Sequence, residues 1–203
     1  MTSLYEKLHS SEVETADSDG PGPSRFIPQN SLEQILTESA IKQTLAKTEP
    51  AENFFKLPEL TQHILGGGKK LFSVLILIKR EDAVSRFLES DQLQELNSRL
   101  PFKLDNDLRA ILGNQDDAEK FYKAQWRVIA PILRHDRSHR AFHQMTVLPF
   151  VQCENLPGGG NGTISRITLH PSHQLLVTPD LDGRVGVFEP LNMYPVVHET
   201  NMI

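Results

Sequence analysis

Cysteine is almost absent from this sequence, since Cys153 is the single cysteine among 203 residues. One thiol cannot form an internal disulfide, which excludes a small secreted domain held together by disulfides. We interpret Cys153 as a buried or idle thiol rather than a catalytic nucleophile. The first thirty residues also lack the basic segment and apolar run of a secretory signal. We therefore expect an intracellular protein, located in the cytoplasm or the nucleus.

The sequence also has no excess of positive charge and no long apolar run. Its 21 basic and 26 acidic residues are mixed along the chain and give a formal net charge of -5. Without a basic patch, nucleic acid is not expected as a partner. The most apolar run, Leu71 to Ile78, is eight residues long, whereas a helix that spans a bilayer needs about 20. A membrane partner is therefore not expected either.

The distribution of apolar residues divides the chain into parts. Residues 1–29 are polar and acidic, with too few apolar side chains to offset the entropy of ordering them, and we predict a disordered arm. Residues 30–125 carry apolar residues at helical spacing, and we predict a helical leader domain there. At 203 residues the chain is long enough for such a domain to bury a core without disulfides or metals.

Several helices can be placed within the leader. Ser31 and Gln34 fit a capping box, followed by apolar residues at three- and four-residue steps, which predicts one helix from about Leu32 to Lys47. The glycines at 66–68 predict a hinge after a short helical turn. Periodicity leaves open whether the apolar run at 71–78 is a buried strand or helix, but helical spacing beyond it favours a helix. Further helices are predicted at 92–100, 105–112 and 116–123, the last with a capping box from Asp116 to Glu119.

Short β-type runs begin after the helical leader. The runs at 126–133 and 146–151 are rich in β-branched and aliphatic residues, and we predict that residues 126–150 form a hairpin-like linker. Both runs contain proline, which places them at edges or strand ends. The predicted fold class is α+β: a mainly helical N-terminal region followed by a few antiparallel strands.

A glycine-rich segment lies between two apolar stretches near the end of the chain. Leu156 precedes four glycines within five residues, and Ile164 opens the next apolar stretch. Glycines between two antiparallel strands let backbone N–H groups approach nucleotide phosphates with no Cβ in the way. The candidate nucleotide-binding residues are Leu156, Gly158, Gly159, Gly160, Gly162 and Ile164. A flexible surface loop would have the same composition.

The surrounding segments resemble a known family. The order of four segments is similar to that in filamentous-fungal protein-kinase-like proteins with a helical leader. These segments are Phe121 to Pro131, Leu148-Pro149-Phe150, the glycine segment and Leu169 to His173. The resemblance implies that residues 151–203 are a truncated kinase small-lobe fragment from a serine/threonine kinase ancestor. It places Gly159 and Gly162 on the second and third signature glycines.

The sequence departs from the kinase pattern at the residues that matter for activity. Pro157 takes the place of the first signature glycine, and Asn161 stands where an aromatic residue usually covers the phosphates. The last lysine is Lys123, upstream of the glycine segment, so the lysine that holds the α- and β-phosphates is missing. The catalytic-loop and magnesium aspartates cannot be assigned either. The resemblance therefore implies at most weak ATP binding and no phosphoryl transfer by this chain alone.

Two other interpretations stay open. His135, His139 and His143 lie four residues apart and could line one helix face, but the interleaved arginines oppose a metal ion, and no metal is expected. The alternative function is a helical protein-interaction or regulatory module that binds a protein partner through the leader and does not bind nucleotide. Nucleotide should change the melting temperature only under the kinase-like hypothesis.

Overall fold

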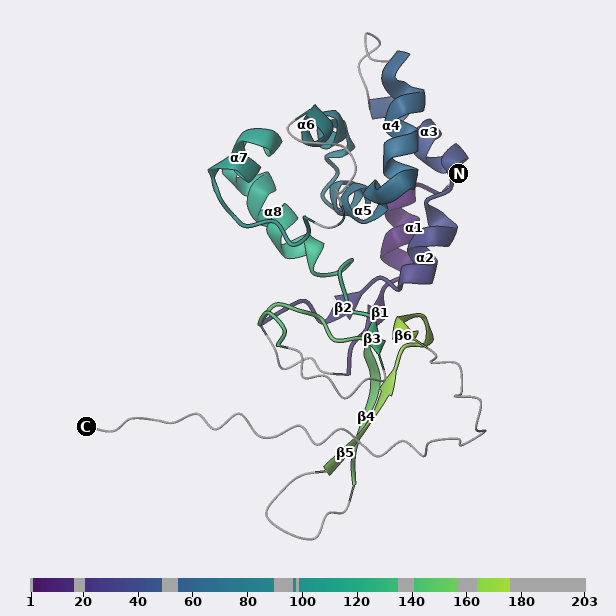
Figure 1. Ribbon diagram of the computed structural model, residues 1–203, viewed down its shortest axis with the longest axis vertical. Helices are drawn as coiled ribbons and strands as arrows, with labels where there is room; N and C mark the ends of the chain where they lie inside the picture. The colour runs from purple at the N-terminus through teal and green to yellow at the C-terminus, as the bar shows by residue number, and fades with distance from the viewer. Residues whose placement is uncertain are drawn as a thin grey trace, which may run out of the picture.

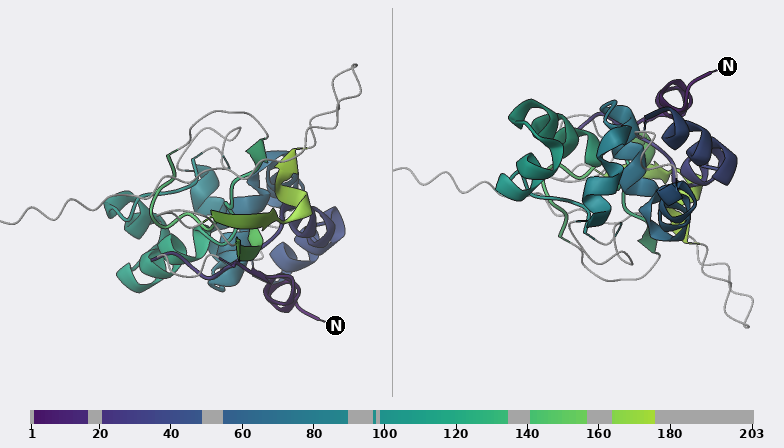
Figure 2. Two further views of the ribbon diagram at one scale, coloured as in Figure 1. Left: turned by 90° about the horizontal axis from the view of Figure 1, so that it is seen from below. Right: turned by 90° about the horizontal axis from the view of Figure 1, so that it is seen from above.

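The computed structural model describes residues 2–16, 21–48, 55–89, 97, 99–134, 141–156 and 164–175. Helices occupy one half of the molecule and strands the other half (Figure 1). The views from below and from above show the helices as one group (Figure 2). The fold class is α+β, mostly helical at the N-terminal side with antiparallel strand pairs, as the sequence predicted.

The N-terminal residues are folded, and the prediction of a disordered arm is wrong for residues 2–16 and 21–29. Helix α1 (Leu4–Ser10) begins with a capping box between Ser3 and Glu6 and buries Leu4 and Leu8. Strand β1 (Val13–Glu14) pairs antiparallel with β2 (Arg25–Phe26). The apolar residues of this region are few, but they contact the helical core and thus offset the entropy of ordering the chain.

The helix predicted from Leu32 to Lys47 is two helices. Helix α2 (Gln29–Ile35) starts directly after Pro28, so Ser31 lies inside the helix and the predicted capping box is wrong. Helix α3 (Glu38–Thr48) follows a break at Leu36, whose ψ is 65°. The Thr37 hydroxyl accepts a hydrogen bond from the Ala40 N–H at 3.4 Å and so satisfies a free donor at the new helix start.

The three glycines lie in a continuous helical path with a kink. Helix α4 (Leu57–His63) runs through a π-helical turn (Ile64–Gly68) into α5 (Lys69–Leu77), and Gly67 has non-helical backbone angles. The side-chain oxygen of Asn97 accepts hydrogen bonds from the N–H groups of Lys70 and Leu71 at 3.1 and 3.4 Å. Asn97 thereby caps the helix start that the kink creates, as an N-cap residue would.

The apolar run at 71–78 is a helix, as its context favoured. Every residue of α5 from Leu71 to Leu77 is buried, so α5 is the central helix of the core. A 3-10 turn (Glu81–Ala83) and α6 (Val84–Glu89) follow a left-handed residue, Lys79, with φ of 58°. The predicted helix at 92–100 lies mostly outside the described residues.

The last two helices have clear caps. The side chain of Asp105 caps α7 (Asn106–Leu112), and the side chain of Asn114 caps α8 (Gln115–Gln125). The predicted capping box from Asp116 to Glu119 is therefore wrong by two residues. Apolar side chains from every helix, α1 to α8, form one buried cluster. The partly buried ring of Phe102 packs against this cluster and contacts the buried rings of Phe87 and Phe121, with all three centroid distances between 5.4 and 5.7 Å.

The strands after α8 pair differently from the prediction. Strand β3 (Leu133–Arg134) pairs in parallel with β6 (Gln174–Leu175), and β4 (Phe150–Leu156) pairs antiparallel with β5 (Ile164–Leu169). The predicted hairpin within 126–150 is therefore wrong, since neither run pairs with the other. Each run instead pairs with a strand that comes later in the sequence, and a local sequence pattern cannot predict such a distant partner.

Candidate functional site

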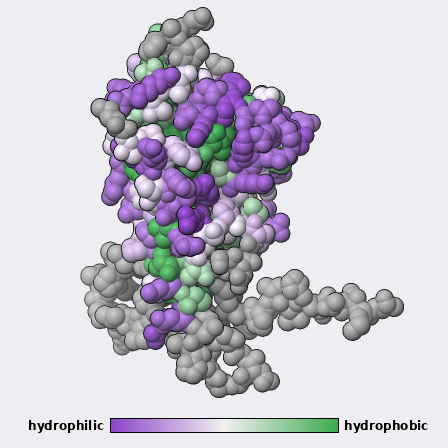
Figure 3. Space-filling model, turned by 180° about the vertical axis from the view of Figure 1, so that it is seen from behind, coloured by the Kyte–Doolittle hydropathy of each residue, from purple (hydrophilic) through white to green (hydrophobic). Residues whose placement is uncertain are grey.

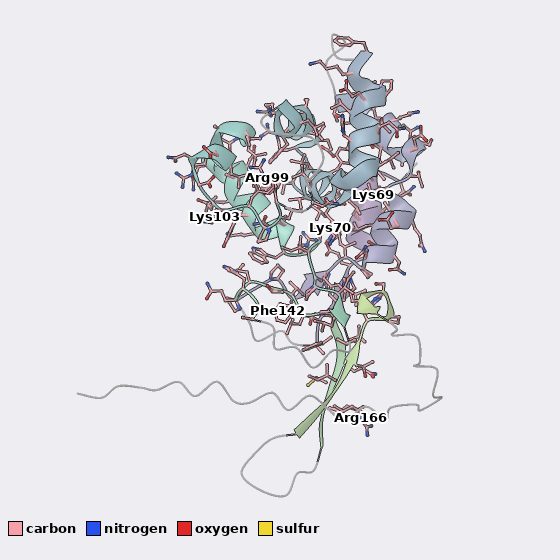
Figure 4. All side chains as sticks on the ribbon, in the orientation of Figure 1. Lys69, Lys70, Arg99, Lys103, Phe142 and Arg166 are labelled. Atoms are coloured by element: carbon pink, nitrogen blue, oxygen red, sulfur yellow. The ribbon has the colours of Figure 1, made fainter. Side chains whose placement is uncertain are left out.

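The antiparallel pair β4 and β5, called the hairpin below, projects away from the helices (Figure 1). On one side of it, Glu154 and Arg166 form an ion pair at 3.7 Å, and the Thr168 hydroxyl donates to Gln152 at 3.4 Å. The Arg166 side chain lies far from the helical half (Figure 4). The hairpin is thus held mainly by its own backbone ladder and by exposed polar pairs, which contribute little each.

The hairpin carries the predicted glycine segment at its tip. Leu156 and Ile164 are opposite each other in the antiparallel register, so the structure brings together the two aliphatic ends of the candidate site. Gly158, Gly159, Gly160 and Gly162 lie outside the described residues. Strands thus flank the segment on both sides, at Phe150–Leu156 and Ile164–Leu169.

Cys153 lies on the hairpin and is exposed, so the buried form of the predicted thiol is wrong. It stands opposite Ile167 in the register, and none of the described acidic or basic side chains is paired with it. Within the described residues, no group of three His, Cys, Asp or Glu side chains could hold a metal ion. Of the three histidines weighed as ligands, His143 stacks on Trp126 at 4.6 Å, and His135 and His139 lie outside the described residues.

The base of the hairpin is attached to the N-terminal region. The Thr15 hydroxyl donates to the Leu148 carbonyl at 2.8 Å, and the Ala16 N–H donates to the Phe150 carbonyl at 2.7 Å. Phe26 (β2), Trp126, Ala130 and Val147 form a second, small buried cluster beside this joint. The N-terminal region therefore connects the helical half to the hairpin.

Two histidines that sequence reasoning did not single out pack on this second cluster. The rings of His170 and His173 contact the Phe26 ring edge to face, with centroids 5.8 and 5.3 Å away. His173 is 2% exposed, and its Nδ1 lies 3.1 Å from the Pro131 carbonyl oxygen. Its other nitrogen, Nε2, is buried without a hydrogen-bond partner. The only sequence signal was a Pro-Ser pair between two histidines, which suggests a turn but not burial.

Burial lowers the pKa of His173, and the hydrogen bond with Pro131 partly opposes this. The charges of His170 and Lys70 lower the pKa of His173 further. Burial also lowers the pKa of His170 and of Lys70. Lys70 belongs to the first turn of α5 and lies where the helices meet the strands (Figure 4). This group of three nitrogen side chains, called the histidine cluster below, contains no acidic residue.

A shallow pocket of about 190 Å³ lies on the other side of the hairpin base. Its walls come from Gly22 and Pro23 and from the segment 142–148, in which Phe142 is 43% exposed. A Cβ added at Gly22 would lie 2.6 Å from the Met145 carbonyl oxygen, so this wall requires glycine. Its only titratable lining residue is His143, which gives the pocket no pair of groups for acid–base chemistry.

The chain matches no protein-family model, no curated protein and no solved structure. No helix in the described ranges is both long and apolar enough to cross a membrane. Figure 3 shows one face covered mostly by hydrophilic residues, with hydrophobic residues in small separate patches. The hairpin and the histidine cluster at its base are therefore the features from which a function can be argued.

Proposed function

We propose that this chain is a degenerate protein-kinase-like protein, in which the hairpin corresponds to the glycine-rich loop and its two strands. It binds ATP at most weakly and transfers no phosphoryl group by itself. The observation that supports this proposal is the register of the hairpin, in which Leu156 and Ile164 face each other across the glycine segment. In a kinase hairpin the corresponding aliphatic residues stand on either side of the phosphate-binding loop.

The residues that phosphoryl transfer needs are missing from the sequence. No strand that follows the glycine segment can supply a lysine, because the last lysine of the chain is Lys123 in α8. A kinase requires that lysine together with two aspartates that hold magnesium and the substrate hydroxyl. Without them the loop can contribute backbone N–H contacts to phosphate but no charge neutralisation, which limits affinity.

The test is a thermal melt of the whole chain with magnesium and ATP. A ligand at five times its Kd stabilises the folded state by about 1 kcal/mol, which for this chain length corresponds to roughly 2–4 °C. We expect a saturable rise of this size at millimolar ATP and its loss in Gly162→Val, which adds a branched side chain to the loop. The matched control is Gly66→Ala, where an added Cβ meets nothing within 4 Å.

Two outcomes would contradict the proposal in different ways. An unchanged melting temperature with ATP, or an equal rise in Gly162→Val, would exclude nucleotide binding by the hairpin. Turnover of ATP with a protein substrate by the purified chain would exclude the degenerate assignment.

The second candidate function is a helical protein-interaction module. The observation that favours it is the exposure of Phe55, which lies two residues before α4 and is 76% exposed. The helices form a contiguous core of their own, so Phe55 is not needed to complete it. Exposed aromatic residues often anchor protein partners. Under this function ATP leaves the melting temperature unchanged, which separates the two candidates in the same experiment.

A further inference from the structure

The last described segment, the 3-10 turn Pro171–His173 with strand β6, is held by a strand pairing, by the buried ring of His173 and by contacts of the turn with α2. We call these residues, 171–175, the clasp. Within the described residues, β6 pairs with β3 through Leu133 with Gln174 and Arg134 with Leu175. His173 is a further anchor, since its ring inserts between Phe26 and the chain at Pro131. Short strand pairings contribute little by themselves, so the buried ring of His173 is a main contributor to the docking of the clasp.

The hydrogen bonds of His173 fix its docked charge state. A carbonyl oxygen can only accept, so Nδ1 carries the proton that is shared with Pro131. Nε2 of the neutral ring then carries a lone pair, and this atom is buried with no partner. Protonation would place both a charge and an N–H donor at a buried atom that has no acceptor among the described residues.

The neighbours of His173 make a positive charge there more costly. Lys70 from α5 and His170, just before the clasp, are the charged or titratable groups that act on His173, and both oppose its protonation. From β3 and the residues before it, the groups that face His173 are the carbonyls of Pro131 and Ala130. Helix α2 also contacts the turn, but its acidic residue Glu33 pairs with Lys69. Among the described residues, no carboxylate is therefore placed to neutralise a protonated His173.

We propose that protonation of His173 releases the clasp, so that the base of the hairpin opens as the pH falls. The docked form requires neutral His173, and the released form lets the ring protonate in water. Opening would free the edge of β3 and expose the Phe26 ring, which is fully buried in the docked form. Release of the clasp does not depend on nucleotide binding at the hairpin tip. If the clasp is not released at low pH, the proposed function is unaffected.

The direction of the pH effect follows from the lowered pKa of His173. In the released clasp the ring titrates at its ordinary pKa of about 6.5, and in the docked clasp it titrates lower. Docking is thus fully stable above about pH 6.5 and is lost as the pH falls from there through the docked pKa. Within that window the opening equilibrium increases by up to about tenfold per pH unit.

The experiment measures amide hydrogen exchange of residues 172–175 in the full chain between pH 7.5 and pH 5, corrected for the intrinsic rate at each pH. We expect protection to fall across this range in the wild type and to change little in His173→Phe, which keeps an aromatic ring but cannot titrate. Lys70→Met should weaken the pH response, because the neighbouring charge is removed. The matched control His63→Gln, on α4, should respond like the wild type.

An NMR titration of the wild-type histidine ring signals keeps the proposal testable if a variant does not fold. A His173 pKa below 6.5 is expected. A His173 pKa at or above 6.5, or equal corrected protection of the clasp at pH 5 and pH 7.5, would overturn the proposal. A pH response in His173→Phe as large as that of the wild type would overturn it as well.

Discussion

Single glycines in this chain have opposite roles, which depend on backbone angle rather than on position in the sequence. Gly113 ends α7 in a left-handed conformation with φ of 85°. Gly66 lies in the helical path between α4 and α5 with open space where a Cβ would be. A side chain is strained at the first site and is tolerated at the second.

Gly113→Ala should therefore lower the free energy of unfolding by about 1 kcal/mol, because an L side chain is strained at positive φ. Gly66→Ala should raise it by roughly 0.5 kcal/mol, because alanine restricts the unfolded chain and favours helix. Urea unfolding of both variants beside the wild type gives the comparison. Equal effects of the two substitutions would show that the backbone angle at Gly113 is not the cause.

Gln125 is a buried polar residue with a defined role. It is fully buried in α8, its Oε1 accepts from the Phe102 N–H at 2.7 Å, and its Nε2 donates to the Phe102 carbonyl at 2.9 Å. Gln125 thus satisfies both backbone groups of Phe102, a partly buried residue outside the helices and strands.

Gln125→Leu should destabilise the fold by about 1–3 kcal/mol, because two partly buried backbone groups lose their partner while the side-chain volume is nearly kept. The control is Gln43→Leu on the exposed side of α3, which should change stability by less than about 0.5 kcal/mol. Denaturant midpoints for the two variants decide the matter. A midpoint in Gln125→Leu like that of the control would mean that water replaces the amide.

At the scale of elements, α1 is the clearest departure from what the sequence suggests. Its seven residues are too short to be helical alone, and the surrounding 29 residues read as disordered. The helix forms because α1 packs against α5 and α2, and its residue Leu8 is fully buried. Its stability comes from contacts with residues far along the chain, which local composition does not report.

Leu8→Ala should accordingly cost about 2–4 kcal/mol, as a core leucine does. Lys7→Ala, at the adjacent exposed position of the same helix, should be close to neutral. Circular dichroism melts of the two variants make the test. Equal melting temperatures would mean that α1 does not contribute to the core.

Whether the other helices and strands could be predicted depends on whether nearby residues in the sequence determine them. Helix α5 could be predicted because its apolar run continues at helical spacing, and α7 because Asp105 precedes a periodic segment. The break at Leu36 and the pairing of β3 with β6 could not, since they depend on a threonine cap and on a partner strand about forty residues away. The capping boxes predicted at Ser31 and Asp116 are wrong, because several neighbouring residues could begin each helix and their spacing in the sequence does not decide which one does.

The candidate site divides in the same way. The hairpin around the glycine segment follows from two apolar stretches separated by glycines, so its topology could be predicted. The histidine cluster could not, because His173 meets a carbonyl 42 residues earlier and an aromatic ring from the N-terminal region. Nothing near His173 in the sequence indicates that its ring is buried.

At the scale of the whole molecule, the helical half and the strand half are joined by the N-terminal region. Glu12, whose side chain is 2% exposed, pairs with Arg127 just after α8, and the Ile27 N–H donates to the Arg127 carbonyl at 2.7 Å. Trp126, the single tryptophan, lies in the small cluster between the halves. Its fluorescence therefore reports on the joint, whereas circular dichroism reports mainly on the helices.

At pH 7.5 we expect the two signals to give coincident thermal transitions, because the joint is buried and shared by both halves. Glu12→Gln should lower both transitions together, since it leaves the Arg127 charge without its partner. A fluorescence transition that precedes the loss of helix would show that the halves unfold separately.

The bond from Thr15 to Leu148 spans 133 positions of the sequence. During synthesis, therefore, the N-terminal region leaves the ribosome long before the residues that hold it exist. Until Leu148 has emerged, the small cluster that buries Phe26 is incomplete, and apolar side chains of the early chain lack their final partners. Contacts of such long range form slowly. The order in which the chain is made thus leaves the nascent N-terminus, rather than the late glycine hairpin, as the part that most needs protection from aggregation.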